Sequence, residues 1–534
     1  MKEKFNYRKL IIFLGLFIVI TIFNYMYHSK IEVSSDSTTL IPMAKDFLKG
    51  NILLESWILG TNNFYFTDMI YFALGFLFQL KSSTLVYLIP AAVQAATVVL
   101  LIYFFFDFDV KGSALKDKWS LGVGVLAVLT ILGVTAPQVA YTLLNVNSHN
   151  IVYLYFIFAL MLAFQYTKKG KMPYLIFYIL LCTLSAFSDG VTQMVIFAPV
   201  CMCCIVCIIK REDVRRNIII FGGTVAGFVF SKLLLIIVEY AGGLVTRGLP
   251  LQLASPADWW QRFRGFVHTF FEFFNYRGIQ YCGLLSWEGV YHIIITIYII
   301  LIPIILLYNF IFIFKISKKR MVLFWCSIIN IASCVATNVV VFNRYLAPFF
   351  IFGSMLLILT VYDLSIKFKN EKYLKANALK LVNYIYVFVL CAALLFTGAY
   401  KLNLIHDMGR FGDLQRQVAS VLMEKQWGNG YGDFWSSSII SYYTDFQCEI
   451  YPVEITAGST AISPYVELVS KRWYEEKDKH FIIRYNVVTT IDMDTMVSLI
   501  GQPDETVEIG PYTLFYWSND ISDYVITYDK RENL

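Results

Sequence analysis

Charged side chains are scarce in this sequence. Asp, Glu, Lys and Arg make up 15% of its 534 residues, whereas an ordinary soluble domain has about a quarter. Hydrophobic residues make up 58%, and the mean hydropathy is +0.60. The apolar residues are gathered into runs of roughly 18 to 25, the length that crosses a hydrocarbon core. The composition excludes a soluble globular protein and predicts an α-helical polytopic membrane protein.

The sequence also lacks a concentrated basic surface. The net charge is only +6, and Lys and Arg occur in short clusters between the apolar runs. These clusters lie at 111–118, 168–171, 210–216, 315–320 and 367–375. Such spacing is the positive-inside pattern of cytoplasmic loops. The expected partner is therefore membrane lipid and not nucleic acid.

No small-x-small cleavage site follows the first apolar run, 10–27. We therefore expect a retained anchor with a cytoplasmic N-terminus in the cell membrane. Further spans are expected near 84–106, 119–136, 150–166, 172–187, 190–209, 217–240, 289–314, 321–342, 345–366 and 379–400. About eleven spans place the C-terminal tail outside, provided that the apolar piece 64–80 does not cross. We expect that piece to be an interfacial or re-entrant helix; the alternative is that another segment fails to span.

The composition becomes that of a water-soluble domain near residue 402. The sequence thus predicts a transmembrane catalytic domain at 1–401 and a small extracytoplasmic α/β domain at 402–534. In the second domain we expect helices near 408–427, 466–476 and 492–500, strands at 439–443, 448–455 and 481–485, and a final hairpin turning at Gly510 and Pro511. The glycines at 428–432 lack the spacing of a dinucleotide-binding turn, so no nucleotide site is expected.

Histidine is missing where cysteine is most frequent. The run C-M-C-C-I-V-C at 201–207 has no histidine and no polar neighbours that could complete a metal site. Thiols in apolar spans behave as small hydrophobes. Only Cys282 and Cys448 are expected to face outside, and their spacing leaves open whether they pair. We predict no cofactor and no metal, with a divalent metal as the open alternative.

Asp36 is the first candidate for chemistry. It lies in the polar loop 34–68, directly after the first apolar span. An ionisable residue at a membrane surface is a functional candidate, and one carboxylate suffices to remove a proton from an acceptor hydroxyl during sugar transfer. The alternative is helix capping. Asp36 and its serine neighbours are good N-cap residues, Pro42 suits a first helical turn, and Gly50 suits a helix stop.

An aspartate soon after span one, followed by the short amphipathic segment A-K-D-F-L-K-G-N, resembles the GT-C superfamily of membrane glycosyltransferases. Members include protein mannosyltransferases, the aminoarabinose transferases of lipid A and the catalytic subunits of oligosaccharyltransferase. The stretch N-R-Y-L-A-P at 343–348 is similar to the R-Y-L-x-P of many members, and the outer C-terminal domain is in the usual place.

The resemblance implies a GT-C-like fold with its active site on the outer face. It implies a polyprenyl-phosphate-linked sugar donor and an inverting transfer in which Asp36 is the base. The acceptor would be a cell-envelope glycan, a teichoic-acid-like polymer, a lipid or a protein. The Lys-, Ile- and Phe-rich composition is typical of an AT-rich bacterial genome.

The sequence departs from the family in the second outer loop, 137–150. That loop often carries a second acidic residue, sometimes for a divalent metal, and here it has none. It offers Asn147 and His149 instead, which we expect to bind substrate. His149 would orient the acceptor or the donor phosphate; alternatively it is a solvated interface residue.

A lipid-linked phosphate needs fixed positive charge, and arginine holds phosphate through paired hydrogen bonds. Arg344 is the first candidate, with snorkelling to the headgroups as its alternative role. Arg262, Arg264 and Arg277 are second choices in the Trp- and Phe-rich segment 241–288. Such a segment also suits an amphipathic stretch in the headgroup layer.

Two further aspartates complete the set of substrate-binding candidates. Asp189 lies between two spans in F-S-D-G. It would bind a substrate hydroxyl or pair with an arginine, unless it only caps a helix end. Asp68 closes the first loop and would line the cleft.

Two other classes of function compete with the enzyme. A transporter or flippase of lipid-linked glycans typically shows paired repeats and helices broken at mid-membrane. The sequence has no internal repeat, and its polar residues collect at one face. A non-catalytic membrane scaffold or sensor that uses the C-terminal domain would make the outer-loop charges dispensable.

Overall fold

The computed structural model describes residues 7–30, 33–107, 137–144, 149–248, 252–276, 278, 280, 283, 286–338, 342–370, 412–488 and 490–531. The chain divides into two compact units. Unit 1 comprises Met1–His28, Pro90–Lys232 and Pro250–Met408, and unit 2 comprises Ser29–Ile89, Leu233–Leu249 and Gly409–Leu534.

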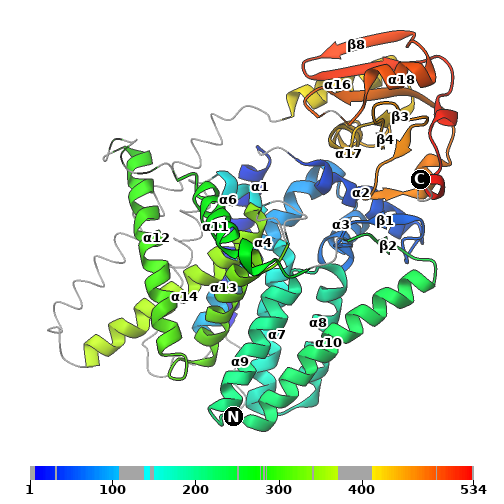
Figure 1. Cartoon of the computed structure of the whole chain (residues 1–534). Coiled ribbons are helices and arrows are strands. Elements are labelled where there is room, and N and C mark those ends of the chain that lie inside the picture. The colour runs from blue at the N-terminus through cyan, green and yellow to red at the C-terminus, as the bar shows by residue number, and fades with distance from the viewer. Residues whose placement is uncertain are drawn as a thin grey trace. The chain divides into compact units, whose positions relative to one another are not determined.

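Unit 1 is built from helices. They are α1 (Tyr7–His28), α4 (Ser82–Asp107), α6 (Pro137–Leu144), α7 (Asn150–Lys169), α8 (Met172–Ser188), the π-helical turn η2 (Gln193–Phe197), α9 (Ala198–Ile209), α10 (Val214–Tyr240), the 3₁₀ turn η3 (Pro256–Asp258), α11 (Trp259–Phe273), α12 (Trp287–Ile311), α13 (Lys318–Ala336) and α14 (Asn343–Asn370). The first turns of α4 and the last turns of α10 belong to unit 2. Within unit 1, α7 packs on α8, and α13 packs on both α9 and α14 (Figure 1).

Among the described residues, seven helices are long and apolar enough to cross a membrane: Leu10–His28, Ser82–Phe104, Asn150–Lys169, Val214–Tyr240, Tyr291–Ile311, Lys318–Ala336 and Asn343–Val361. Shorter apolar helices cover Tyr65–Leu77, Met172–Ser188 and Gln193–Ile209. The spans expected near 119–136 and 379–400 lie outside the described residues. The helical membrane class is supported, whereas the count of about eleven spans is not confirmed.

Aromatic rings fill much of the unit 1 core where α11 meets α14. Phe270 and Phe349 pack edge to face with their ring centroids 5.6 Å apart, and Phe273 packs on Phe350 at 6.0 Å. Edge-to-face pairs contribute about 0.5–1.5 kcal/mol each beyond the area they bury. The Phe-rich middle of 241–288 is therefore a helix with one buried aromatic face.

Unit 2 contains a six-stranded sheet with the order β5-β4-β3-β7-β9-β8 (Figure 1). Its strands are β3 (Asn429–Gly432), β4 (Ile450–Glu454), β5 (Ser463–Pro464), β7 (Lys479–Tyr485), β8 (Glu505–Ile509) and β9 (Tyr512–Tyr516). β3 runs parallel to β4 and β7, and the other pairs are antiparallel. β8 and β9 form the expected hairpin, in which Gly510 takes the positive φ (+56°) that tight hairpin turns require.

The sheet is accompanied by the helices α16 (Asp413–Lys425), α17 (Phe434–Tyr443), α18 (Met493–Ile500) and α19 (Tyr528–Arg531) and the 3₁₀ turns η5 (Lys471–Tyr474) and η6 (Ser522–Tyr524). An α/β fold in the C-terminal region is as predicted. The expected helix near 408–427, strand at 481–485 and helix near 492–500 are confirmed by α16, β7 and α18.

Unit 2 also includes the first loop. Its elements there are α2 (Ser35–Leu48), β1 (Trp57–Leu59), the π-helical turn η1 (Tyr65–Met69) and α3 (Ile70–Leu77). β1 lies between β2 (Val245–Thr246) and β6 (Val469–Ser470) in a second, three-stranded sheet. α2 packs on α17, where the Ser35 hydroxyl donates to the Trp435 carbonyl (2.9 Å). Three segments far apart in the sequence thus fold as one body.

Two local predictions in the C-terminal region are wrong. The segment 439–443 is the second half of helix α17 and not a strand, although Ile and Tyr favour strands. The helix starts because Asp433 caps it, accepting hydrogen bonds from the Trp435 and Ser436 amides. The segment 466–476 is not a helix; it holds β6 and η5. In unit 1, part of the expected loop 137–150 is the helix α6.

Candidate functional site

A buried histidine–aspartate pair joins two helices of unit 1. Asp189 follows the last residue of α8, and one carboxylate oxygen, Oδ1, accepts a hydrogen bond from the Val191 amide (2.9 Å). The other oxygen, Oδ2, lies 2.7 Å from Nδ1 of His149. The side chains are 2% exposed for His149 and 0% for Asp189. Asp189 therefore has the helix-end position that was the alternative to a binding role. It also has an ionisable partner, but this partner is a histidine and not the expected arginine.

His149 precedes α7 in a left-handed backbone conformation, with φ at +64°. Histidine tolerates this region better than most residues, yet the conformation is uncommon. The ring also stacks on Tyr345, with centroids 5.7 Å apart and planes 23° from parallel. The carboxylate and the ring together fix the imidazole, so α7, the α8–η2 turn and α14 meet at one point.

The pair lies at the helix ends that are remote from the basic loops. α7 has 20 residues and ends at Lys168 and Lys169, and α8 has 17 residues and begins after Lys171. At 1.5 Å per residue, the helices place the pair about 25–30 Å along the axis from those lysines. This separation matches the thickness of a hydrocarbon core and supports a position near the face opposite the basic loops.

Arg344 is the second residue of α14 and the neighbour of Tyr345. Its guanidinium carbon lies 5.6 Å from the Phe342 ring centroid and 5.4 Å from that of Tyr345. No carboxylate forms an ion pair with it among the residues that the structure describes. The Asn330 amide group donates to the Tyr345 carbonyl (2.8 Å), which holds the start of α14. Aromatic faces thus support the guanidinium, and its charge remains available for an anion.

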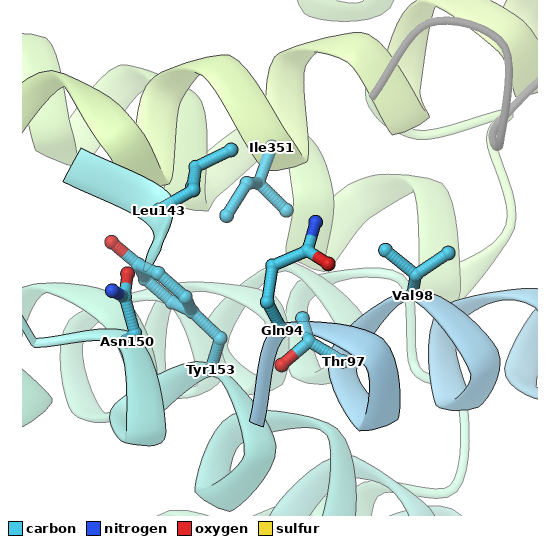
Figure 2. Close-up of a pocket in the computed structure, with 7 residues that line it drawn as sticks. All are labelled: Gln94, Thr97, Val98, Leu143, Asn150, Tyr153 and Ile351. Atoms are coloured by element: carbon cyan, nitrogen blue, oxygen red, sulfur yellow. The ribbon is translucent and has the colours of Figure 1, made fainter. Parts of the chain in front are cut away.

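A small pocket lies close to the pair. Figure 2 shows the polar side chains of Gln94, Thr97, Asn150 and Tyr153 around it, together with apolar ones. The full lining is Gln94, Thr97, Val98, Leu143, Asn150, Tyr153 and Ile351, from α4, α6, α7 and α14. The Tyr153 hydroxyl is buried and has no hydrogen-bond partner within the described part of the chain. The pocket therefore brings polar groups into the interior of unit 1.

Asp36 belongs to unit 2 and lies in the first turn of α2, where it is half-buried. The capping residue is Ser34, whose hydroxyl accepts from the Ser37 amide (3.3 Å). Asp36 is therefore not the N-cap residue of α2, although a carboxylate in the first turn still interacts favourably with the helix dipole. Pro42 lies in the helix interior and not in its first turn, whereas Gly50 follows the end of the helix with φ at +103°, as expected.

The remaining candidates are distributed over both units. Asp68 is 2% exposed within η1 of unit 2. Arg262 is half-buried and Arg264 is exposed on α11 in unit 1. Arg277 and Asn147 lie outside the described residues. The structure brings together His149, Asp189 and the start of α14 with Arg344, all within unit 1.

Two tyrosines of this region were not predicted from the sequence. Tyr345 is part of the R-Y-L-A-P stretch, so its place next to Arg344 in the sequence could have marked it as a candidate site residue. Tyr153 lies one helical turn after His149 and faces the same region, but a tyrosine in an apolar run carries no distinctive signal. Both residues contribute polar or ring contacts that only the packing of the helices defines.

The cysteines provide no metal centre in the described residues, where no group of three or more His, Cys, Asp or Glu side chains could hold an ion. Cys448 is a buried thiol of unit 2 that donates to the Gly428 carbonyl (2.8 Å). Burial raises its pKa to about 12, so the thiolate is disfavoured. Cys282 lies outside the described residues.

The chain was compared with models of protein families and with curated proteins, and neither comparison found a match.

Proposed function

We propose that the protein is a GT-C-type glycosyltransferase of the cell membrane. It moves one sugar, a hexose or a pentose, from a polyprenyl-phosphate donor to a cell-envelope acceptor, with Asp36 as the general base. The acceptor is a glycan, a teichoic-acid-like polymer, a lipid or a protein. In this proposal the N-terminus is cytoplasmic, and unit 2 with its α/β sheet is extracytoplasmic.

The observation that carries the proposal is that the first loop folds with the C-terminal α/β region. Ser35, next to Asp36, donates to the Trp435 carbonyl (2.9 Å), and the hydroxyls of Thr39 and Ser438 lie 3.1 Å apart. These contacts support placing both segments on one face of the membrane. This common unit holds the start of α2 on a rigid support, as a catalytic carboxylate requires.

The position of Asp36 along the chain also favours a place near the headgroups. It is the eighth residue after His28, the last residue of α1. Even a fully extended connection of that length reaches only about 26–29 Å. The carboxylate thus remains within reach of a substrate whose lipid tail is in the bilayer.

The proposed reaction needs a base and a group that stabilises the leaving phosphate. The acceptor hydroxyl oxygen attacks the anomeric carbon, its proton passes to the Asp36 carboxylate, and the bond to the phosphate oxygen breaks with inversion. The polyprenyl phosphate leaves with the bonding electrons. Arg344, which has no acidic partner in the described chain, is proposed to bind that phosphate.

The test compares Asp36 with an aspartate that also lies at the start of a helix of unit 2. Asp36 and Asp413 both lie in the first turn of a helix of unit 2, so both interact with a helix dipole worth about 0.3–1 kcal/mol. The full protein in detergent is supplied with labelled undecaprenyl-phosphate sugars and a crude envelope acceptor. We expect Asp36→Asn to lower transfer on the order of 10²- to 10⁴-fold and Asp413→Asn to leave it unchanged.

Each failure has a distinct meaning. If the natural protein leaves every donor intact, the glycosyltransferase proposal is wrong. If Asp36→Asn transfers sugar at the natural rate, Asp36 is not the base, although the reaction class stands. An equal loss in both variants would assign Asp36 to helix stability.

A transporter of lipid-linked glycans is the second candidate because a buried ionisable pair inside a membrane unit is typical of proton-coupled transport. The pair of His149 and Asp189 lies at helix ends and not within a broken helix, which favours the enzyme. Reconstituted vesicles that carry a fluorescent lipid-linked sugar distinguish the two. Movement of the intact lipid across the bilayer without transfer, abolished by Asp189→Asn, would establish transport.

A further inference from the structure

Six large apolar side chains of unit 2 are exposed on α2, α3 and the residues that follow these helices. They come from the end of α2 and the turn after it, and from the end of α3 and the residue that follows. They are Leu48 (37% exposed), Ile52 (59%), Leu53 (36%), Leu74 (46%), Leu77 (65%) and Phe78 (78%). We name this set the apolar patch. A set of this size on a folded unit indicates an interaction surface.

The two elements that carry the apolar patch are packed together. α2 contacts α3, and the Lys45 ammonium lies 5.9 Å from the centroid of the Phe76 ring. The Tyr65 hydroxyl donates to the Ile52 carbonyl (2.8 Å), which ties the turn after α2 to η1. Leu74 lies three and four residues, about one helical turn, before Leu77 and Phe78, so the three share one helix face.

The chain around the apolar patch indicates which partner covers it. α4, a helix of membrane-spanning length, begins at Ser82, only four residues after Phe78. Lys49 and Lys81 flank the two halves of the patch and are exposed, and 70–81 contains no acidic residue. Apolar side chains bordered by lysines suit the boundary between acyl chains and anionic headgroups.

The pairing of β1 with β2 bears on whether the helix Tyr65–Leu77 lies at this boundary or crosses the membrane. Ile58 pairs with Val245, and the Arg247 amide donates to the Leu59 carbonyl (2.8 Å). Both strands therefore lie on one face of the membrane, and the chain between them crosses an even number of times. The sequence predicts six spans between 84 and 240, and three of them lie on described helices that are long enough to cross. If all six cross, a further crossing by Tyr65–Leu77 would separate the strands.

Helix length leads to the same conclusion. The apolar helix Tyr65–Leu77 has 13 residues, which cover about 20 Å. A hydrocarbon core is about 30 Å thick. The helix is therefore too short to cross the hydrocarbon core by itself.

We propose that the apolar patch is seated in the lipid at the headgroup–acyl boundary, so that α2 and α3 dock unit 2 onto the membrane surface. This inference does not depend on the proposed glycosyltransferase activity. The occupant is the anionic lipid surface itself and not a second protein.

The test uses a fluorophore on single cysteines in the full protein, reconstituted in vesicles of mixed neutral and anionic lipid. Leu77→Cys and Phe78→Cys probe the patch. Leu414→Cys on α16 (40% exposed) is the aqueous control, and Ile297→Cys on α12 (51% exposed) is the control within a span. The unsubstituted protein, labelled in parallel, gives the background from native cysteines. All four side chains are exposed, so the variants are expected to fold.

We expect the labels at 77 and 78 to be quenched several-fold less by aqueous iodide than the label at 414. Lipids brominated near the headgroup should quench them more than lipids brominated near the chain end. Quenching by iodide as strong as at 414 would show the patch to be in water. Strong quenching by deep bromines, as expected at 297, would show a crossing. Protection from every quencher would indicate a protein partner. Each of these three results would overturn the proposal.

Discussion

Two buried aspartates, one in each unit, show how differently a carboxylate can be accommodated. Asp433 in unit 2 and Asp189 in unit 1 are each 1% exposed. Asp433 accepts hydrogen bonds from the Trp435, Ser436 and Tyr485 amides and from the Ser436 hydroxyl. Asp189 accepts one local amide hydrogen bond and is otherwise paired with His149, which lies 40 residues away.

The difference separates a structural carboxylate from a functional candidate. Burial raises the pKa of Asp433, even though its four hydrogen bonds act in the opposite direction. Every donor comes from the helix that it caps or from the adjacent strand β7, so Asp433 fixes a helix start. Asp189 instead pairs with an ionisable side chain from another segment, His149, whose ring stacks on Tyr345, the residue that follows Arg344. Such groupings are characteristic of functional sites.

The largest effect on stability is expected from breaking the pair in unit 1. Asp189→Ala leaves His149 buried without its carboxylate, which should lower the free energy of unfolding by about 3–5 kcal/mol. Buried cysteines report on each unit separately during heating in detergent with a thiol-reactive fluorophore. Cys182 and Cys326 of unit 1 should become reactive at a lower temperature, while Cys448 of unit 2 should not change.

The matched control replaces both members of the pair by leucine. A double variant removes both buried polar groups and should be less damaging than either single variant. Additive losses in His149→Leu, Asp189→Leu and the double variant would contradict an energetic coupling between the two side chains.

The next effect concerns the capping carboxylate of unit 2. Asp433→Ala leaves four donors without their acceptor, and we expect a loss of about 2–4 kcal/mol. In the same heating experiment, Cys448 should now react first and the cysteines of unit 1 should not change. Asp433→Asn retains one acceptor oxygen and should retain part of the stability. Loss of sugar transfer without loss of stability would instead move Asp433 into the functional class.

The sequence predicted what local patterns encode and missed what distant contacts decide. Long apolar runs and basic loops predicted the helical membrane class, and the period and turn residues around Gly510 predicted the β8–β9 hairpin. The cap at Asp433 outweighed the strand preference of 439–443. No local pattern indicates that the three-residue strand β1 pairs with β2, far along the chain, or that histidine is the partner of Asp189. Such choices depend on packing between segments that are remote in sequence.

A smaller effect is expected at Arg344, whose partner in the proposal is a substrate and not another residue. Arg344→Gln should raise KM for the polyprenyl-phosphate donor about 10- to 100-fold, the value of a charged hydrogen bond, and should also lower kcat because Arg344 is proposed to stabilise the leaving phosphate. Arg344→Lys should recover part of the loss because lysine keeps the charge but not the paired geometry. Arg264→Gln on α11 is the control for general loss of positive charge. Equal changes in KM for both glutamine variants would assign Arg344 to lipid anchoring.

The smallest effect is expected at Asp520, which tests whether a set of local hydrogen-bond donors marks a structural carboxylate at the surface. Burial on its own would raise its pKa, but hydrogen bonds from the Ser522 hydroxyl and from the Lys479, Asp478 and Ser522 amides outweigh burial and lower it. A lowered pKa in the folded state means that the ionised form stabilises the fold above the pKa of the unfolded chain, about 3.9. This contribution is lost as the pH falls through the folded pKa.

Hydrogen exchange of the full protein provides the measurement for Asp520. The amides of residues 478, 479 and 522 should be protected near neutrality and lose protection, relative to the rest of β7, as the pH falls below about 4. Asp520→Asn should remove that pH dependence without changing sugar transfer. Asp520 would then share the structural role of Asp433 despite its exposure, and a persistent pH dependence in the Asn variant would show that another carboxylate controls these amides. Asp433 and Asp520 would then be alike because their hydrogen-bond donors are mainly backbone amides, whatever their burial. Asp189 differs because its partner is an ionisable side chain.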